Sequence, residues 1–313
     1  MSYITDFPDG VSSYGSPVSG GRFSSPWATH YFVDATDGSD LQDGKSPGNA
    51  KATIQAAVTA ATGGDVIYIR PQVYTVGTGF ARYTEDVTVS MSTAAGSGTD
   101  TKANKSIIGV TQRGHPSDFL GVRWKYATNT NLTIEAPGTH IENIGFFAED
   151  STYAINIVNN AQTTLGGTGT SIYNCAIKGD PGIYANGADE LQIVNCRFQA
   201  KYDGTTSGIE LVGSQNQIKR PLIQNCEFVG GNGNEMKTAP IVGAAPWHDA
   251  LIRDCYFAND VDSGVYINIA GSTSTGSIAN CQFAVADIST TYIVEGGLLV
   301  TGAYDGGGLA TAS

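Results

Sequence analysis

A short pattern of alternating apolar and polar positions recurs along the chain. Each copy reads isoleucine, any residue, asparagine or aspartate, cysteine, any residue, then phenylalanine or isoleucine. The copies begin at Ile141, Ile172, Ile193, Ile223, Ile252 and Ile278. The first copy has Ile144 in place of cysteine, and the steps from Ile144 through the successive cysteines are 31, 21, 30, 29 and 26 residues. One structural element therefore recurs while the loops between its copies vary in length.

A second apolar strand recurs between these copies. It has the form glycine, apolar, any residue, apolar, as in "GIYANG", "GIELVG" and "GVYINIAG", with "YAINIV" and "APIVGA" as looser members. Two or three short strands in each repeat predict a parallel solenoid, because one rung cannot bury its apolar face alone and stacked rungs can. The pattern thus predicts an all-β fold.

Residues 53–62, "TIQAAVTAAT", form the one clear helix that the sequence predicts. Thr53 can cap its N-terminus, apolar residues recur on one face, and two glycines follow its end. A helix at this position would cover the open end of the first rung. We therefore expect an extended N-terminal docking arm over residues 1–30, a solenoid over 31–290, and a C-terminal strand with a Gly-rich tail over 291–313.

All five cysteines occupy the same position of the repeat. A zinc site draws on closely spaced pairs, whereas the nearest two cysteines here are 21 residues apart. A disulfide between rungs would need an S–S torsion that parallel side chains fit poorly, and the count is odd. We expect free, buried thiols that pack as small apolar groups, and no metal or cofactor.

Asparagine before each cysteine suits a tight turn, since it tolerates the left-handed conformation. Stacked on itself from rung to rung, it would form an amide ladder. The expected ladder of turn and packing residues consists of Asn174, Cys175, Asn195, Cys196, Asn225, Cys226, Asp254, Cys255, Asn280 and Cys281.

Candidate catalytic residues are sparse on the outward side of the second strand. If the first apolar residue of each strand points inward, the outward column runs Tyr184, Glu210 and Tyr266. Glycoside hydrolysis uses two carboxyl groups, so a partner for Glu210 would have to come from loop residues such as Asp203, Asp249 or Asp262. Glu210 is the first candidate if the chain is an enzyme, and a solvated strand residue otherwise.

The two outward tyrosines of this column, Tyr184 and Tyr266, are the candidate carbohydrate-binding residues, because aromatic faces stack on sugar rings. Aromatic residues also fill outward strand positions through β-propensity alone, so both interpretations stay open.

Four aspartates recur at every third position of "DATDGSDLQDG": Asp34, Asp37, Asp40 and Asp43. A helix–loop–helix calcium site needs ligands at alternate positions and a glutamate at the twelfth. The stretch does not match that pattern, and Asp-Gly pairs are common turn residues, so we expect turns here and no metal.

Composition and charge narrow the function classes. The chain has 313 residues, 40 glycines and only 15% charged residues, which is typical of a turn-rich β protein. Its net charge of −12 disfavours nucleic-acid binding. No apolar run approaches the ~18 residues of a membrane span, and the start "MSYITDFPDGVSS" lacks the regions of a signal peptide. We expect the protein to leave a cell by lysis or within an assembly.

The repeat, together with "YFVDATDGSDLQDGKSPGNAKATIQAAVTAATGGDVIYIRPQVYT", resembles the right-handed parallel β-helix superfamily, the pectate-lyase-like fold. The resemblance covers roughly residues 31–290 and implies a right-handed parallel β-helix with one N-terminal capping α-helix. In polysaccharide lyases of this fold, calcium-binding acidic residues and a basic catalytic residue lie on one outward sheet surface. Many functions are built on this scaffold, so fold alone does not give the activity.

The opening "MSYITDFPDGVSSYGSPV" followed by this β-helix resembles tailed-bacteriophage virion proteins of the head-decoration or tailspike-like kind. The resemblance implies a homotrimer in the virion, made in the host cytoplasm, whose arm docks on the major capsid protein or other virion proteins. An arm folded back on its own domain is the alternative.

The function that we expect first is a structural capsid decoration or cement protein without enzymatic activity. The alternative is a polysaccharide lyase or tailspike-like depolymerase. A further alternative is a non-catalytic carbohydrate-binding fibre that contacts host-surface glycans through an exposed aromatic platform around Tyr184 and Tyr266.

Overall fold

The computed structural model describes most of the solenoid and little of the N-terminal arm. The described residues are 12–13, 16–17, 28–72, 74–75, 79–80, 82–90, 103–110, 121–148, 153–158, 166–200, 207–213, 218–230, 236–259, 265–270, 273–284, 293–294, 296–305 and 308–310. Within them the chain forms β-strands, one α-helix, α1 (Ile54–Ala60), and one 3-10 turn, η1 (Pro47–Asn49). Most of the predicted arm, residues 1–30, lies outside the described residues.

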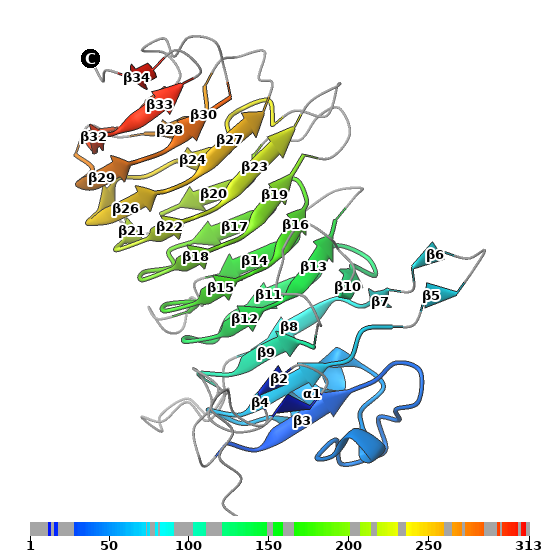
Figure 1. Cartoon of the computed structure of the whole chain (residues 1–313). Coiled ribbons are helices and arrows are strands. Elements are labelled where there is room, and N and C mark those ends of the chain that lie inside the picture. The colour runs from blue at the N-terminus through cyan, green and yellow to red at the C-terminus, as the bar shows by residue number, and fades with distance from the viewer. Residues whose placement is uncertain are drawn as a thin grey trace, which may run out of the picture.

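Three sheets run along the molecule, as Figure 1 shows, and their strands are parallel except for β34, which pairs antiparallel with β33. Sheet 1 contains β3 (His30–Val33), β4 (Val66–Ile69), β9 (Ser106–Gly109), β12 (His140–Glu142), β15 (Ser171–Tyr173), β18 (Gln192–Val194), β22 (Leu222–Gln224), β26 (Ala250–Arg253), β29 (Gly276–Ala279) and β32 (Leu299–Thr301). Sheet 2 contains β7 (Tyr83–Thr84), β10 (Val122–Lys125), β13 (Ile144–Phe147), β16 (Ala176–Lys178), β19 (Arg197–Gln199), β23 (Glu227–Gly230), β27 (Tyr256–Asn259), β30 (Gln282–Phe283), β33 (Ala303–Asp305) and β34 (Gly308–Ala310).

Sheet 3 contains β8 (Val87–Val89), β11 (Leu132–Ile134), β14 (Ile155–Val158), β17 (Ile183–Asn186), β20 (Ile209–Val212), β24 (Ile241–Gly243), β28 (Ile267–Ile269) and β31 (Ile293–Val294). Three two-stranded pairs complete the described strands: β1 (Ser12–Ser13) with β2 (Ser16–Pro17), β5 (Tyr74–Thr75) with β6 (Gly79–Phe80), and β21 (Ile218–Lys219) with β25 (Trp247–His248).

From β9 onward, each rung gives one strand to sheet 1, then one to sheet 2, then one to sheet 3. Neighbouring rungs pair in register, so that Ile172 lies opposite Ile141 on one side and Ile193 on the other. The repeat isoleucines therefore stack on each other along the coil. Parallel pairing between neighbouring rungs continues through β31, β32 and β33. These strands lie beyond residue 290, where the sequence places the end of the solenoid. The fold is an all-β parallel helix.

A single left-handed residue turns the chain from sheet 1 into sheet 2. Its φ lies between +51° and +59° in the six rungs with the motif, at Asn143, Asn174, Asn195, Asn225, Asp254 and Asn280. Asparagine and aspartate tolerate this conformation better than other residues with a Cβ atom. The turn explains why asparagine recurs in the motif.

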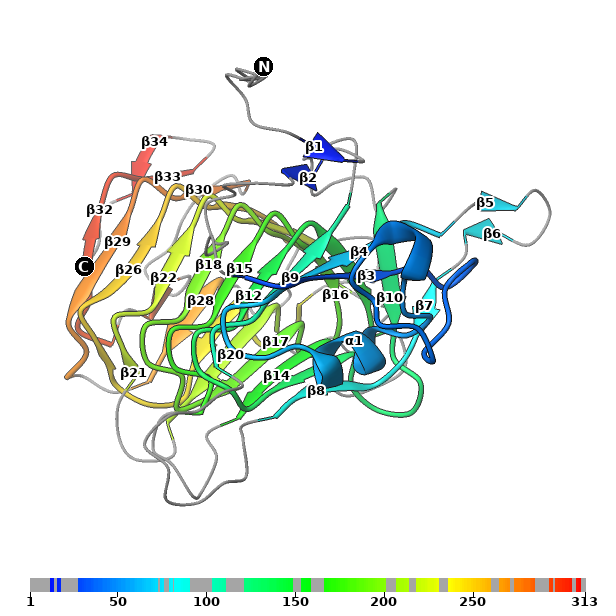
Figure 2. The same cartoon turned by 90° about the horizontal axis from the view of Figure 1, so that it is seen from below.

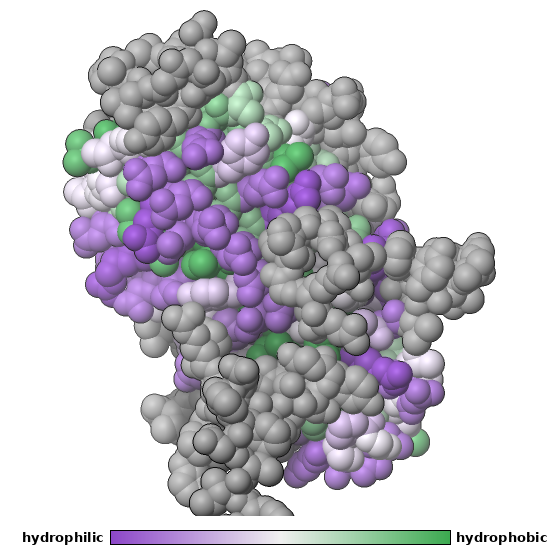
Figure 3. Space-filling view, viewed as in Figure 1, coloured by the Kyte–Doolittle hydropathy of each residue, from purple (hydrophilic) through white to green (hydrophobic). Residues whose placement is uncertain are grey.

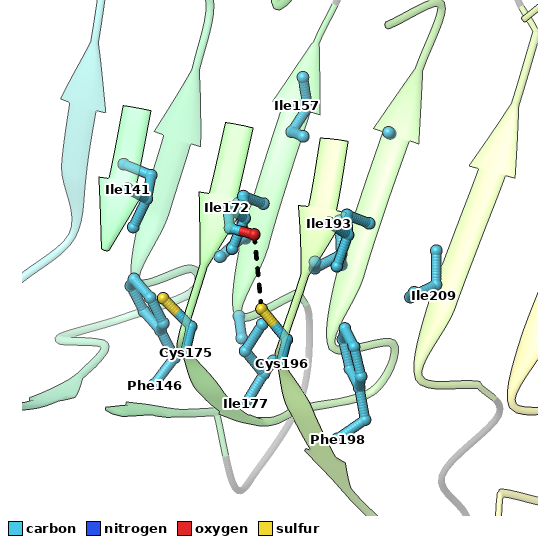
Figure 4. Packing of buried hydrophobic residues seen from close by; sticks show 14 of the residues in the cluster. Ile141, Phe146, Ile157, Ile172, Cys175, Ile177, Ile193, Cys196, Phe198 and Ile209 are labelled. Atoms are coloured by element: carbon cyan, nitrogen blue, oxygen red, sulfur yellow. Dashed lines mark hydrogen bonds between the residues drawn. The ribbon is translucent and has the colours of Figure 1, made fainter. Parts of the chain in front are cut away.

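The residue after each turn points into the core. All five cysteines are free and buried, and Figure 4 shows the Sγ of Cys196 directed at the carbonyl oxygen of Ile172, at 3.5 Å. Burial raises the pKa of the Cys196 thiol above its usual range. A thiol in this setting packs as a small apolar group rather than reacting.

The last apolar position of the motif builds an aromatic stack inside the coil. The rings of Phe198, Phe228, Phe257 and Phe283 lie parallel within 8°, with centroids 4.8–4.9 Å apart. That spacing equals the distance between adjacent strands, so the stack follows directly from in-register pairing. In the earlier rungs the position is filled by Ile177 and Phe146, both labelled in Figure 4.

The helix α1 covers the N-terminal end of the coil, which Figure 2 shows from below. The hydroxyl oxygen of Thr53 accepts a hydrogen bond from the backbone N–H of Ala56 at 3.2 Å, as an N-cap. The carboxylate of Glu85 accepts two more, from the N–H groups of Ile54 and Gln55. Ile54, like the rest of its face, is buried on the first rungs. The helix lies within the predicted range of 53–62. No described helix is long and apolar enough to cross a membrane.

Candidate functional site

The outer face of sheet 3 carries one column of partly exposed residues across five consecutive rungs. In strand register, this column runs Asn156, Tyr184, Glu210, Val242 and Asn268. Tyr184 and Glu210 are direct neighbours, as the sequence predicts. Val242, from the loosely matching strand "APIVGA", lies between Glu210 and Asn268.

Tyr266 does not belong to this column, and its predicted outward position is wrong. It lies just before β28 and is only 2% exposed. Its ring packs edge-on against Phe257 and Phe283, with centroids 6.1 and 5.4 Å apart. The inward residue of this rung that pairs with Ile241 is Ile267, the first residue of β28, rather than Val265, which lies before the strand. An exposed aromatic platform that includes Tyr266 is therefore excluded.

Tyr184 instead stacks on a tyrosine that the sequence analysis missed. The rings of Tyr153 and Tyr184 have centroids 4.4 Å apart and an interplanar angle of 20°. Both side chains are partly exposed. Burial is the largest cause that raises the pKa of Tyr184, and the nearby Tyr153 and Glu210 raise it further. The pair presents an aromatic surface beside the carboxyl group of Glu210.

The carboxyl group of Glu210 is within electrostatic reach of a second one, that of Asp180. Partial burial raises the pKa of Glu210 above its ordinary value, and the negative charge of Asp180 raises it further. Asp180 lies in the turn that leads from β16 into β17, at the start of the strand that carries Tyr184. A carboxyl group shifted in this direction keeps its proton to a higher pH than a solvated one.

The loop aspartates proposed as partners of Glu210 do not fill this role in the described structure. Asp203 and Asp262 lie outside the described residues. Asp249 lies at the opposite end of the sheet 3 strands, in the turn into sheet 1, where its N–H donates to the hydroxyl of Thr275 at 2.9 Å. A search of the turns before each "Gly–apolar–x–apolar" strand would have found Asp180 in "DPGIYANG".

The aspartates of "DATDGSDLQDG" make local structural contacts. Arg70 pairs with both Asp34 and Asp37. Asp40 accepts hydrogen bonds from the backbone N–H and the hydroxyl of Thr53, both at 2.9 Å, and so holds the start of α1. Among the described residues, no group of three or more His, Cys, Asp or Glu side chains is placed to hold a metal ion.

Figure 3 shows the face of the molecule seen in Figure 1, and hydrophilic residues dominate its described part. Hydrophobic residues appear there as small, separate areas. An interaction surface on this face would therefore depend on polar groups rather than on a broad apolar platform.

Known proteins resemble this chain in fold. No family model matches it, and no curated protein matches it in sequence. A pectin methylesterase from Aspergillus niger, in deglycosylated form, matches 91% of this chain and 88% of its own length, at 14% identity and a TM-score of 0.52. A pectin methylesterase from carrot matches 88% and 89%, at 13% identity and a TM-score of 0.49. A rhamnogalacturonan lyase matches 82% and 67%, at 14% identity and a TM-score of 0.43.

The likeness to the Aspergillus niger protein, together with the parallel sheets, confirms the predicted parallel β-helix fold. The same finding overturns the expectation that the chain is not an enzyme. That expectation rested on the apparent lack of an assembled site on this scaffold. The matched protein is an enzyme, and on the same fold here the charge of Asp180 acts on the carboxyl group of Glu210 and raises its pKa. The virion location, the capsid partner and the homotrimer stay predictions.

Proposed function

We propose that this chain cleaves glycosidic bonds in a polysaccharide, as a tailspike-like depolymerase, on the outer face of sheet 3. The observation that carries the proposal is the position of Glu210 beside Tyr184, whose ring stacks on Tyr153, with the charge of Asp180 acting on the Glu210 carboxyl group to raise its pKa. Two carboxyl groups beside an aromatic surface are the groups that glycoside hydrolysis uses.

Glu210 takes the role of general acid. Its pKa is raised by burial and by the charge of Asp180, so its proton is retained for transfer to the leaving glycosidic oxygen. Asp180 is the second carboxylate, which stabilises or attacks the sugar centre directly or through a water molecule. Tyr184, stacked on Tyr153, holds a sugar ring against the sheet.

Hydrolysis is favoured over β-elimination on this face. Elimination needs a base together with positive charge to stabilise the developing anion. The eight strands of sheet 3 contain no lysine and no arginine, and Glu210 is their one carboxylate. Proton donation by a carboxylic acid fits this composition better.

The location that we propose is the virion of a tailed bacteriophage, with host-surface glycans as substrate. Its support is the likeness of the first 18 residues to those of virion β-helix proteins. A homotrimer, held on other virion proteins by residues 1–30, belongs to the same proposal. Deleting residues 1–30 should prevent incorporation into particles, and unchanged incorporation would contradict the docking role.

Size-exclusion chromatography of a polysaccharide after incubation with the protein tests the activity itself. A panel of neutral and acidic polysaccharides, including pectin, serves as substrate. The wild-type protein should shorten at least one member, whereas Glu210→Gln should leave it intact. Glu227→Gln, which removes a carboxylate paired with Arg197 on sheet 2, is the charge-matched control and should act as the wild type does.

A further inference from the structure

A serine, a histidine and a glutamate form a connected chain on the outer face of sheet 1. The Oγ of Ser171 lies 2.8 Å from Nδ1 of His140, and Nε2 of His140 lies 3.3 Å from Oε2 of Glu142. None of the three has a role in the site around Glu210, which lies on sheet 3. The repeat pattern alone does not mark these three residues.

The strand geometry places these side chains together. His140 and Glu142 are two residues apart in β12, so both point to the same face. Ser171 is the register partner of His140 in β15. Aligning "HIEN" with "SIYN" on the repeat isoleucine gives the same pairing from the sequence.

The partners of His140 determine which ring nitrogen carries the proton. The carboxylate of Glu142 is an acceptor, so Nε2 of neutral His140 carries the hydrogen that faces it. Nδ1 is then the acceptor for the hydroxyl hydrogen of Ser171. This tautomer is the one in which the imidazole can take the serine proton as a general base.

The asparagine ladder of the turns ends on Glu142. The side-chain N–H of Asn225 donates to Asn195 at 3.0 Å, Asn195 donates to Asn174, and Asn174 donates to Oε1 of Glu142 at 3.4 Å. Every amide in this run points its donor in the same direction. Glu142 is thereby held through one oxygen and presents the other to His140.

Of the three hydrogen-bonded side chains, the serine is more accessible to a substrate than the histidine. His140 is only 3% exposed, whereas Ser171 is partly exposed. Tyr173 flanks the histidine, with ring centroids 5.5 Å apart. The hydroxyl of Tyr173 donates to Oε1 of Gln192 at 2.8 Å, and Gln192 is the register partner of Ser171 in β18. That bond fixes Oε1 of Gln192, so its NH₂ group is the candidate donor for an oxyanion formed next to Ser171.

From this arrangement we infer a second active site, in which Ser171 is an acyl-accepting nucleophile and His140 its base, acting on an ester of a short acyl group. The Oγ of Ser171 bonds to the ester carbonyl carbon while its proton passes to Nδ1 of His140. The bond from that carbon to the alkoxy oxygen then breaks, and the departing oxygen takes the proton as an alcohol.

Water completes the reaction. The oxygen of a solvent molecule bonds to the acyl carbon while its proton passes to Nδ1 of His140. The bond between the acyl carbon and Oγ breaks, the proton returns to Oγ, and a carboxylic acid leaves. Glu142 acts as a positioning residue that holds the imidazole in the required tautomer.

A fluorophosphonate tests the nucleophile on the full-length protein, because Oγ of an activated serine displaces fluoride from phosphorus. Intact mass and peptide mapping should show one label per chain, on Ser171. His140→Ala should slow labelling by about 10²-fold or more. Ser277→Ala is the matched control: Ser277 occupies the same column of sheet 1 and lies between Leu251 and Leu299, and its removal should leave the labelling rate unchanged.

A test of Glu142 must separate an effect on the reaction rate from a loss of folding stability. Glu142→Gln should slow both labelling and the hydrolysis of p-nitrophenyl acetate at an unchanged unfolding midpoint, and Glu142→Asp should restore part of the rate. Glu210→Gln should label as the wild type does, since this inference does not rest on the proposed glycosidase. Absence of label from Ser171 in the folded wild-type protein, or equal labelling rates for wild type and His140→Ala, would overturn the inference.

Discussion

Tyr184 and Glu210 are register partners in adjacent strands, β17 and β20, and both point outward from sheet 3. Side chains at such paired positions lie within about 5 Å of each other at their Cβ atoms. The aromatic ring and the carboxyl group are therefore fixed side by side by backbone hydrogen bonds rather than by a mobile loop. Asp180, in the turn before the strand that carries Tyr184, supplies the second carboxyl group.

The pH dependence of cleavage should report on this pair. Burial and the charge of Asp180 raise the pKa of Glu210, so activity falls as the pH rises through that raised value and the acid loses its proton. Where Asp180→Asn leaves residual activity, it should move the alkaline limb to lower pH, because the charge that raises the pKa is gone. Initial rates between about pH 4 and 9 measure the limb. An alkaline limb unmoved by the substitution would contradict the coupling of the two groups.

Substitution of Tyr184 should weaken substrate binding more than it affects folding. Tyr184→Ala removes the ring that stacks on Tyr153 at 4.4 Å, and we expect the affinity for an oligosaccharide to fall about 2- to 10-fold. Isothermal titration calorimetry with Glu210→Gln as the background avoids turnover. Val242→Ala, in the same outward column, is the control, and equal losses for the two substitutions would argue against stacking.

The aromatic stack should supply a large share of core stability. Phe228 lies between Phe198 and Phe257 and is fully buried. Phe228→Ala should lower the free energy of unfolding by about 3–5 kcal/mol, through lost burial and the cavity left behind. Tyr256→Ala, on the outer face of β27 with 41% exposure, should change it by about 0.5 kcal/mol or less. Urea denaturation compares the two, and a small loss for Phe228→Ala would show that the stack relaxes.

Two substitutions at Asn195 separate turn strain from the amide ladder. Asn195 has φ +54° and hydrogen bonds to both Asn174 and Asn225. Asn195→Ala should lose about 1–2 kcal/mol from the left-handed conformation, in addition to the ladder bonds. Asn195→Gly loses only the ladder bonds and should be the more stable variant. Thermal unfolding of both proteins measures the difference, and a glycine variant no more stable than the alanine variant would show that the left-handed conformation contributes little.

The sequence predicts the rungs of sheets 1 and 2 well because one side of each strand has a constant composition. The isoleucine, cysteine and phenylalanine of each copy stack on their counterparts, so a small set of residue types repeats at fixed offsets. The left-handed turn adds a second constraint at positions such as Asn195. Few other residues satisfy both demands.

Sheet 3 is less predictable because its strands lack such a marker. In "GVYINIAG" Val265 and Ile267 are both apolar and two residues apart, so the pattern alone allows either to pair with the inward residue of the neighbouring rung. In the structure Ile267 is the residue that pairs with Ile241. Tyr266, which comes just before the strand, is therefore buried in the core. Asp180 and the partners of His140 depend on contacts between rungs, which a repeat written as a single line of sequence does not display.

The most direct test of the proposed glycosidase is the initial rate of new reducing ends on one polysaccharide, measured for wild type, Glu210→Gln, Asp180→Asn and Glu227→Gln. The account predicts turnover by wild type and Glu227→Gln, and rates lower by about 10²-fold or more for the other two variants. Equal rates for wild type and Glu210→Gln, or no reducing ends from any polysaccharide of the panel with the wild-type protein, would contradict it.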